Sequence, residues 1–207
     1  MPLILARHAE STWNRQGRLT GCSDAPLTPR GEAQARAAGR RLAQEVSVLD
    51  AVHTSDLARA GRTAQLMLEA MGRPGIPVGV RPLLRERALG VLEGLTKEEV
   101  RGQWGNEQRK RWRDDPNSAP PGGETIRAAE QRFLICWHRD IVADLIDGRS
   151  VLVVAHAGTI RAILGHLGYP PSRLGNAAWV AVPTEAVRCG PSGAACPPPS
   201  AVATLAT

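Results

Sequence analysis

The sequence predicts an α/β protein with three layers, in which a mostly parallel central sheet carries helices on both faces. Strand-like apolar runs alternate with longer segments of helical periodicity, the order that builds parallel sheets. The clearest run, residues 150–155, contains four consecutive Val and Leu residues, typical of a strand buried on both faces. The 207 residues have the length of a single domain, and no internal repeat or linker divides them.

Each predicted element rests on a local signal. The expected strands are 3–6, 50–54, 78–80 and 150–155, and the expected helices are 29–46, 57–71, 97–112, 125–146 and 159–167. Proline suits the first turn of the helix at 29. Ser55 is expected to cap the next helix, and Thr96 with Glu99 forms a capping box for the third.

Composition excludes several classes of protein. No apolar run approaches the 18 or more residues of a membrane span, and the apolar start is cut off by Arg7-His8, unlike a secretory signal. The net charge of +6 would suit nucleic acid, but the aromatic residues are five Trp, one Tyr and one Phe, and they do not interleave with basic runs as a base-stacking surface requires. We therefore expect a cytoplasmic protein that binds neither membrane nor nucleic acid.

The cysteines and histidines predict no metal site. The four cysteines show no C-x-x-C spacing, and the five histidines show no H-E-x-x-H pattern. We expect residues 1–188 to form the catalytic domain. Residues 189–207 consist mainly of Pro, Ala, Gly and Ser, have little to bury, and are expected to form a mobile tail.

Polar side chains follow the predicted strands at the points where these end. Arg7 and His8 follow the first strand, Arg59 lies one helical turn beyond the second, and His156 follows the strand at 150–155. The carboxyl ends of parallel strands meet at one edge of a sheet, where ligands bind in α/β proteins. The sequence thus predicts that two histidines and two arginines converge on one crevice.

This set of side chains suits phosphoryl transfer through a phosphohistidine. A neutral His8 ring can attack phosphorus while the arginines and His156 neutralise the phosphoryl oxygens. Nearby arginines lower the pKa of His8 and keep it a nucleophile. A carboxyl partly shielded from water must protonate the departing alkoxide, and Glu86, between an apolar stretch and a glycine-containing turn, is the best-placed candidate.

Several motifs resemble those of the histidine phosphatase superfamily. They are Arg7-His8-Ala9-Glu10-Ser11-Thr12-Trp13-Asn14, Leu19-Thr20-Gly21, Pro26-Leu27-Thr28 with Gly31, Ser55-Asp56-Leu57 with Arg59-Ala60, and Val154-Ala155-His156-Ala157-Gly158. The stretch from Leu84 to Glu99, with Trp104-Gly105 and Trp112-Arg113, resembles the 2,3-bisphosphoglycerate-dependent phosphoglycerate mutases. Pro120 to Thr125, without a long insertion before it, resembles their short bacterial form.

The resemblance implies a role for each matched residue. His8 would be the phosphorylated nucleophile and Glu86 the proton donor and acceptor. Arg7, Arg59 and His156 would hold the transferring phosphoryl group; Asn14, Thr20, Gly21, Ala157 and Gly158 would line the same pocket; and Lys97 and Arg113 would hold the carboxylate or distal phosphate of a glycerate. The implied reaction interconverts 2- and 3-phosphoglycerate without a metal, with 2,3-bisphosphoglycerate as the priming phosphate donor.

Three departures from the mutase pattern keep alternatives open. Asp114 stands where the pattern has a second arginine, Leu89 replaces a tyrosine, and Ala157-Gly158 replaces Gly-Asn. Arg113, among other basic residues, also fits a solvated helix face. A phosphomonoesterase acting on a small phosphorylated metabolite is the second reading, and a non-catalytic phosphate-binding protein is the third. The sequence leaves the subunit number open among one, two and four.

Overall fold

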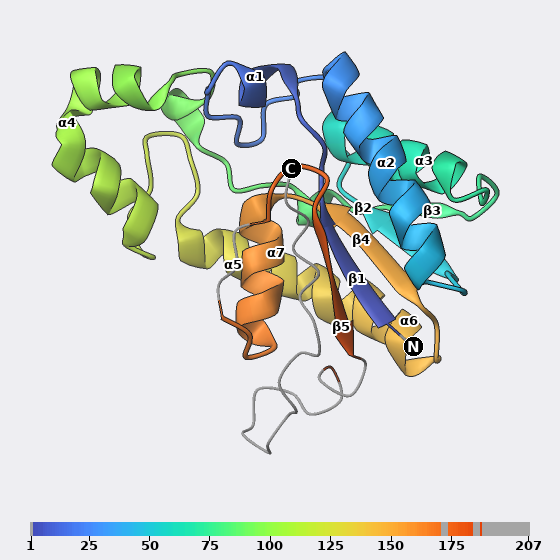
Figure 1. Ribbon diagram of the computed structural model, residues 1–207. Coiled ribbons are helices and arrows are strands. Elements are labelled where there is room, and N and C mark those ends of the chain that lie inside the picture. Colours follow the sequence, from blue (N-terminus) through green and yellow to red (C-terminus); the bar gives the residue numbers. More distant parts are fainter. Residues whose placement is uncertain (1, 171–173, 184–186, 188–207) are drawn as a thin grey trace.

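The computed structural model describes residues 2–170, 174–183 and 187, and its centre is a five-stranded sheet with the strand order β3-β2-β4-β1-β5 (Figure 1). The strands are β1 (Pro2–Arg7), β2 (Ala51–Thr54), β3 (Val78–Val80), β4 (Val151–Ala155) and β5 (Trp179–Pro183). The first four are parallel, and β5 runs antiparallel to β1. The carboxyl ends of β1, β2 and β4 therefore lie at one edge.

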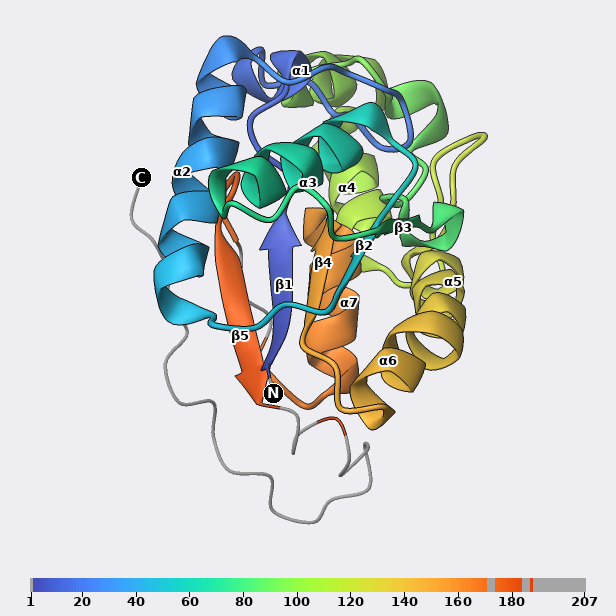
Figure 2. The same ribbon diagram turned by 90° about the vertical axis from the view of Figure 1, so that its right-hand side faces the viewer.

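Helices cover both faces of this sheet, which confirms the predicted three-layer class (Figure 2). One face carries α2 (Pro29–Glu45) and α3 (Ala58–Ala70); the other carries α5 (Ile126–Cys136), a π-helical turn (Trp137–Ile141), α6 (Val142–Ile146) and α7 (Ala157–His166). Side chains of a strand alternate between faces. Accordingly Leu3 and Leu5 pack in the core under α5 and α7, whereas Ile4 and Ala6 pack under α2 and α3.

A third group of elements lies beyond the carboxyl edge of the sheet. It comprises α1 (Thr12–Arg15), two 3₁₀ turns (Pro82–Leu84 and Gly90–Leu92) and α4 (Lys97–Asp114), and Figure 1 shows α4 well apart from the sheet. Leu92, Val100 and Trp112 form a small apolar cluster that holds α4 in place. Gly105, at φ +79°, kinks α4, a backbone angle that glycine adopts without strain.

The structure corrects several sequence expectations. The antiparallel strand β5 was not predicted. Ser55 is not the cap of α3: Leu57 holds the N-cap position, the N–H of Ala58 donates to both carboxylate oxygens of Asp24, and the Ser55 hydroxyl lies 2.8 Å from Nε2 of His156. The helix expected over 125–146 is interrupted by the π-helical turn.

Part of the predicted domain division cannot be compared with the structure. The tail expected at 189–207 lies outside the described residues, so the division at 188 remains a prediction. Within the described segments, no helix is both long enough and apolar enough to cross a membrane.

Candidate active site

His8 and His156 meet where β1 and β4 end. The N–H of His8 donates to the carbonyl of Ala155 at 2.9 Å, which ties the two strand ends together. The two ring centroids are 5.2 Å apart, and the side chains are almost fully buried, His8 being 4% and His156 0% exposed. The sequence prediction that both histidines converge at one sheet edge is therefore met by the fold.

Burial and neighbouring arginines set the state of the His8 ring. Burial is the main cause that lowers its pKa to about 3, and the charges of Arg59 and Arg7 lower the pKa further. Nδ1 of His8 lies 2.8 Å from the carbonyl oxygen of Ala9, to which a protonated Nδ1 donates. The proton is then held on Nδ1, and Nε2 keeps the free electron pair that a nucleophile needs.

His156 is also held neutral. Burial, followed by the charges of His8, Arg59 and Arg7, keeps its pKa well below the ordinary value. Its Nε2 contacts the Ser55 hydroxyl, while Nδ1 is buried without a partner among the described residues.

Arg59 fixes the loop in front of His8. It is 1% exposed and donates from Nη1 to the carbonyl of Ser23 at 2.6 Å and from Nη2 to the carbonyl of Gly21 at 2.7 Å. Arg7 donates from Nη1 to the carbonyl of Leu174 at 2.9 Å. Burial lowers the pKa of both guanidiniums, and their Nε atoms have no partner in the described part of the chain.

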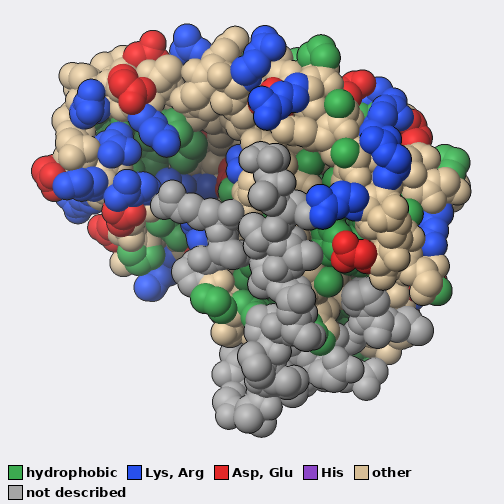
Figure 3. Space-filling view, viewed as in Figure 1, with side chains coloured by type: hydrophobic (Ala, Val, Ile, Leu, Met, Phe, Trp, Pro, Cys, Tyr) green, Lys and Arg blue, Asp and Glu red, His purple; other side chains and the backbone are tan. Residues whose placement is uncertain are grey.

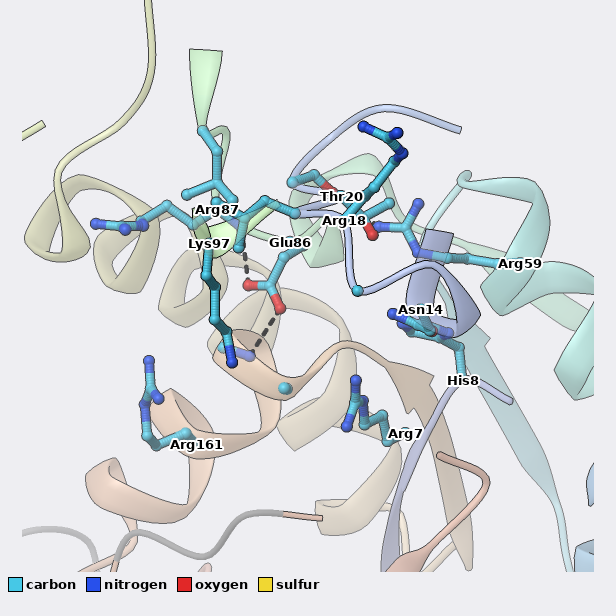
Figure 4. A pocket seen from close by; sticks show the side chains of 16 residues that line it. Arg7, His8, Asn14, Arg18, Thr20, Arg59, Glu86, Arg87, Lys97 and Arg161 are labelled. Carbon is cyan, nitrogen blue, oxygen red and sulfur yellow. Dashed lines mark hydrogen bonds between the residues drawn. The ribbon is translucent and has the colours of Figure 1, made fainter. Parts of the chain in front are cut away.

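Glu86 has a fixed carboxylate at the centre of the site (Figure 4). Its two oxygens accept hydrogen bonds from the backbone N–H groups of Arg87 and Gly158, each at 2.9 Å. The carbonyl of Glu86 accepts from Arg132 at 3.2 Å and from the thiol of Cys22 at 3.0 Å. The candidate proton donor is thus positioned by α7 on one side and by its own loop on the other.

His8, Arg7, Arg59 and Glu86 line one cavity of about 410 Å³. Its walls are formed by Arg7, His8, Asn14, Gly17, Arg18, Leu19, Thr20, Gly21, Arg59, Glu86, Arg87, Leu89, Lys97, Ala157, Gly158 and Arg161. Six of these side chains are cationic and only Glu86 is acidic. Figure 3 shows Lys and Arg side chains around the hollow beneath α4. A cavity of this charge favours a ligand with more than one negative group.

The fold brings most of the predicted site residues to this cavity and leaves one outside. The ring of His156 lies next to that of His8 but outside the cavity wall, and the other predicted residues except Arg113 line that wall. Arg113 lines an adjoining chamber of about 200 Å³ that shares Glu86, Arg87, Gly158 and Arg161 with the main cavity. Arg113 does not line the His8 cavity, and its Nε and Nη2 each lie 2.7 Å from the carboxylate of Asp114, so its expected hold on the distal group of a glycerate stays a prediction.

Four residues of the site were missed from the sequence. Arg18, Arg87 and Arg161 line the cavity, and Asn176 donates from Nδ2 to the carbonyl of His8 at 3.2 Å and to Oδ1 of Asn14 at 3.0 Å. Arg161 lies three residues after Gly158 on α7, so helical spacing was a usable signal. No such signal existed for Asn176, because this residue precedes β5, the strand that was not predicted.

The sequence pattern of the histidine phosphatase superfamily (branch 1) matches residues 3–189. The chain therefore belongs to this superfamily of proteins. Among similar curated proteins, a 2,3-bisphosphoglycerate-dependent phosphoglycerate mutase of Methylobacterium radiotolerans is 43% identical over 162 residues, which are 78% of this chain and 76% of that protein. Mutase 2 of Gloeobacter violaceus is 42% identical over 168 residues, 81% of this chain and 75% of that protein.

Similar solved structures include phosphatases. A mycobacterial glucosyl-3-phosphoglycerate phosphatase in complex with VO3 has a TM-score of 0.73 and 31% identity, covering 87% of this chain and 90% of the other. YhfR of Bacillus stearothermophilus has a TM-score of 0.75 and 30% identity, and the match covers 87% of this chain and 89% of that chain. The relatives thus include both mutases and phosphatases.

Proposed function

We propose that this chain transfers phosphoryl groups through His8 and interconverts 2- and 3-phosphoglycerate, with 2,3-bisphosphoglycerate as the priming phosphate donor. The observation that carries the proposal is the cavity, in which a neutral histidine and a carboxylate lie among six cationic side chains. The curated relatives named as phosphoglycerate mutases at about 40% identity support the same reaction.

The residues divide the first half-reaction among them. Nε2 of His8 attacks phosphorus, the phosphorus–oxygen ester bond breaks, and Glu86, which enters this step as the protonated acid, gives its proton to the departing oxygen and becomes a carboxylate. In this proposal Arg7 and Arg59 neutralise the phosphoryl oxygens as the charge moves, and the neutral ring of His156 holds one of them by a hydrogen bond. In the second half-reaction, Glu86 takes the proton of the accepting hydroxyl, and the phosphoryl group leaves His8 for that oxygen.

The donor set fits a bisphosphorylated primer, which supplies the phosphoryl group that charges His8. Buried Nε atoms of Arg7 and Arg59, Nη1 of Arg87 and Nδ1 of His156 have no protein partner among the described residues. Guanidiniums bind phosphate oxygens in pairs, so these groups suit an anion with two charged ends. The expectations of a metal-independent reaction and a cytoplasmic location remain predictions.

The test measures isomer formation and phosphate release together. Purified protein is incubated with 3-phosphoglycerate, with and without 2,3-bisphosphoglycerate, and 2-phosphoglycerate and inorganic phosphate are quantified. We expect isomerisation that depends on the bisphosphate, with little phosphate release. Phosphate release without isomer would overturn the mutase assignment.

A phosphomonoesterase is the second candidate, and one observation favours it. Arg113, which the resemblance gave to the distal group of the glycerate, is neutralised by Asp114 and lies outside the His8 cavity. A weakly held product leaves before the second half-reaction, and water then accepts the phosphoryl group. The same assay distinguishes this outcome.

A further inference from the structure

The cavity has a second cationic end that the phosphoryl site does not use. Figure 4 shows His8, Asn14 and Arg59 on one side of Glu86, and Arg87, Lys97 and Arg161 on the other. Lys97 and Arg161 are exposed, and within the described residues neither has a hydrogen-bond or ion-pair partner. Both are therefore free to bind an anion.

Within the described residues, no ion pair joins a carboxylate to Lys97 or Arg161, and the charges of Glu86 and Glu124 act on Arg87 only without direct pairing. The oxygens of Glu86 accept from backbone N–H groups, Asp114 is paired with Arg113, and no ion pair joins Arg161 to Glu130 of the adjoining chamber. Arg87 keeps a buried Nη1 without a partner among the described residues and donates Nη2 to the carbonyl of Trp112 at 3.0 Å. Unpaired like charges around a cavity are unfavourable unless a ligand supplies the opposite charge.

We propose that Arg161 joins Lys97, to which the family resemblance already gives the remote group of the substrate, in a clamp on that group, and that Arg161 is the residue that distinguishes an acidic from a neutral remote end. This inference rests on the proposed phosphoryl transfer and adds to it the specificity residue that the sequence did not assign. The clamp takes a carboxylate or a second phosphate, since both offer paired oxygens to a guanidinium.

Arg161 is better placed for this role than Arg113. It lines both the His8 cavity and the adjoining chamber, whereas Arg113 lines only the chamber. It also lies on α7, whose N-cap is His156 and whose Gly158 N–H holds Glu86. One helix thus carries the phosphoryl-binding histidine, the support of the proton donor and the clamp, which fixes their spacing.

The test compares two phosphate esters that differ only at the remote end. 3-Phosphoglycerate carries a carboxylate where glycerol 3-phosphate carries a hydroxymethyl group. The rate of acid-labile phosphoenzyme formation is measured with each radiolabelled ester for wild type, Arg161→Gln, Arg161→Lys and Arg113→Gln. We expect the preference for 3-phosphoglycerate to fall ten- to a hundredfold in Arg161→Gln, the effect of losing a charged hydrogen bond. Arg161→Lys should recover part of it.

Control measurements separate this inference from the proposed function. Arg109→Gln, on α4 and outside both cavities, removes a half-buried guanidinium and changes the net charge by the same amount. The unfolding midpoint of each variant checks that it folds. Absence of phosphoenzyme in the wild type with radiolabelled 2,3-bisphosphoglycerate as well as with both esters would overturn the phosphohistidine reaction, while phosphoenzyme without isomer would overturn only the mutase. A preference that stays within twofold in Arg161→Gln, or that falls in Arg113→Gln instead, would overturn the clamp.

Discussion

The two ends of the cavity are built in different ways. At the inner end, His8 and His156 follow strands, Arg59 is buried, and their main-chain contacts leave little freedom. At the outer end, Lys97 and Arg161 are exposed on helices and have no protein partner among the described residues. The inner end fixes the position of the phosphoryl group, and the outer end can change with the substrate at little cost to the fold.

Replacement of the nucleophile at the inner end is expected to have the largest effect on activity. His8→Asn removes the nitrogen that accepts phosphorus, so we expect isomerisation to fall at least about 10⁴-fold and acid-labile labelling to disappear. His138→Asn is the matched control, since this exposed histidine lies outside the cavity. Equal labelling of His8→Asn and wild type would show that the reaction does not pass through His8.

A methyl group at Gly158 tests the junction between the two ends. A Cβ added there would fall on Oε1 of Glu86, so Gly158→Ala should displace the carboxylate. We expect turnover to fall about ten- to a hundredfold, as misplacement of a catalytic group by about an ångström does. Gly165→Ala is the control on the same helix, because its Cβ would meet nothing within 4 Å. Similar kinetics of the two variants would refute the positioning role of Gly158.

The pH dependence of the free energy of unfolding tests the burial of His8 at the inner end. The unfolded chain protonates His8 near its ordinary pKa of 6.5, whereas burial holds the folded pKa at about 3. Between these values the unfolded state binds more protons, so the free energy of unfolding falls as the pH falls. From pH 7 to pH 5 the loss for His8 is about 2 kcal/mol, set by the unfolded pKa. Urea unfolding at both pH values should show a smaller loss of the free energy of unfolding in His8→Asn than in the wild type. An equal loss in the two proteins would contradict the lowered pKa of His8.

The strands of the sheet and the inner site were predictable because both follow from burial. Residues 150–155 read as a strand because both faces are covered, and strand-end geometry then selected His8, Arg59 and His156. The strand β5 escaped prediction because it ends in Pro183, a residue that cannot donate to a sheet ladder. Ser55 fits the pattern of a helix cap, but tertiary contact with His156 outcompetes that local role.

The outer site was only partly predictable, because it depends on which exposed side chains find partners. Lys97 was expected and lines the cavity, whereas Arg161, on an equally solvated helix face, was missed. The Arg113–Asp114 pair shows the reason. Neighbours in sequence can neutralise each other without any signal of periodicity, so spacing alone cannot show which cation remains free for a ligand.

Release of Arg113 is expected to have the smallest effect. Asp114→Asn removes the carboxylate that binds both Nε and Nη2 of Arg113, yet these side chains are 53% and 58% exposed. An exposed pair contributes little, and Arg113 would still lie in the adjoining chamber, so KM for 3-phosphoglycerate should fall no more than about threefold. Asp115→Asn is the control, since it removes the ion pair to Arg111 and keeps a side-chain oxygen for the N–H of Asn117. A tenfold or larger fall in KM would mean that the freed Arg113 reaches the substrate. In the wild type, pairing with Asp114 would then be what keeps Arg113 from binding the remote acidic group.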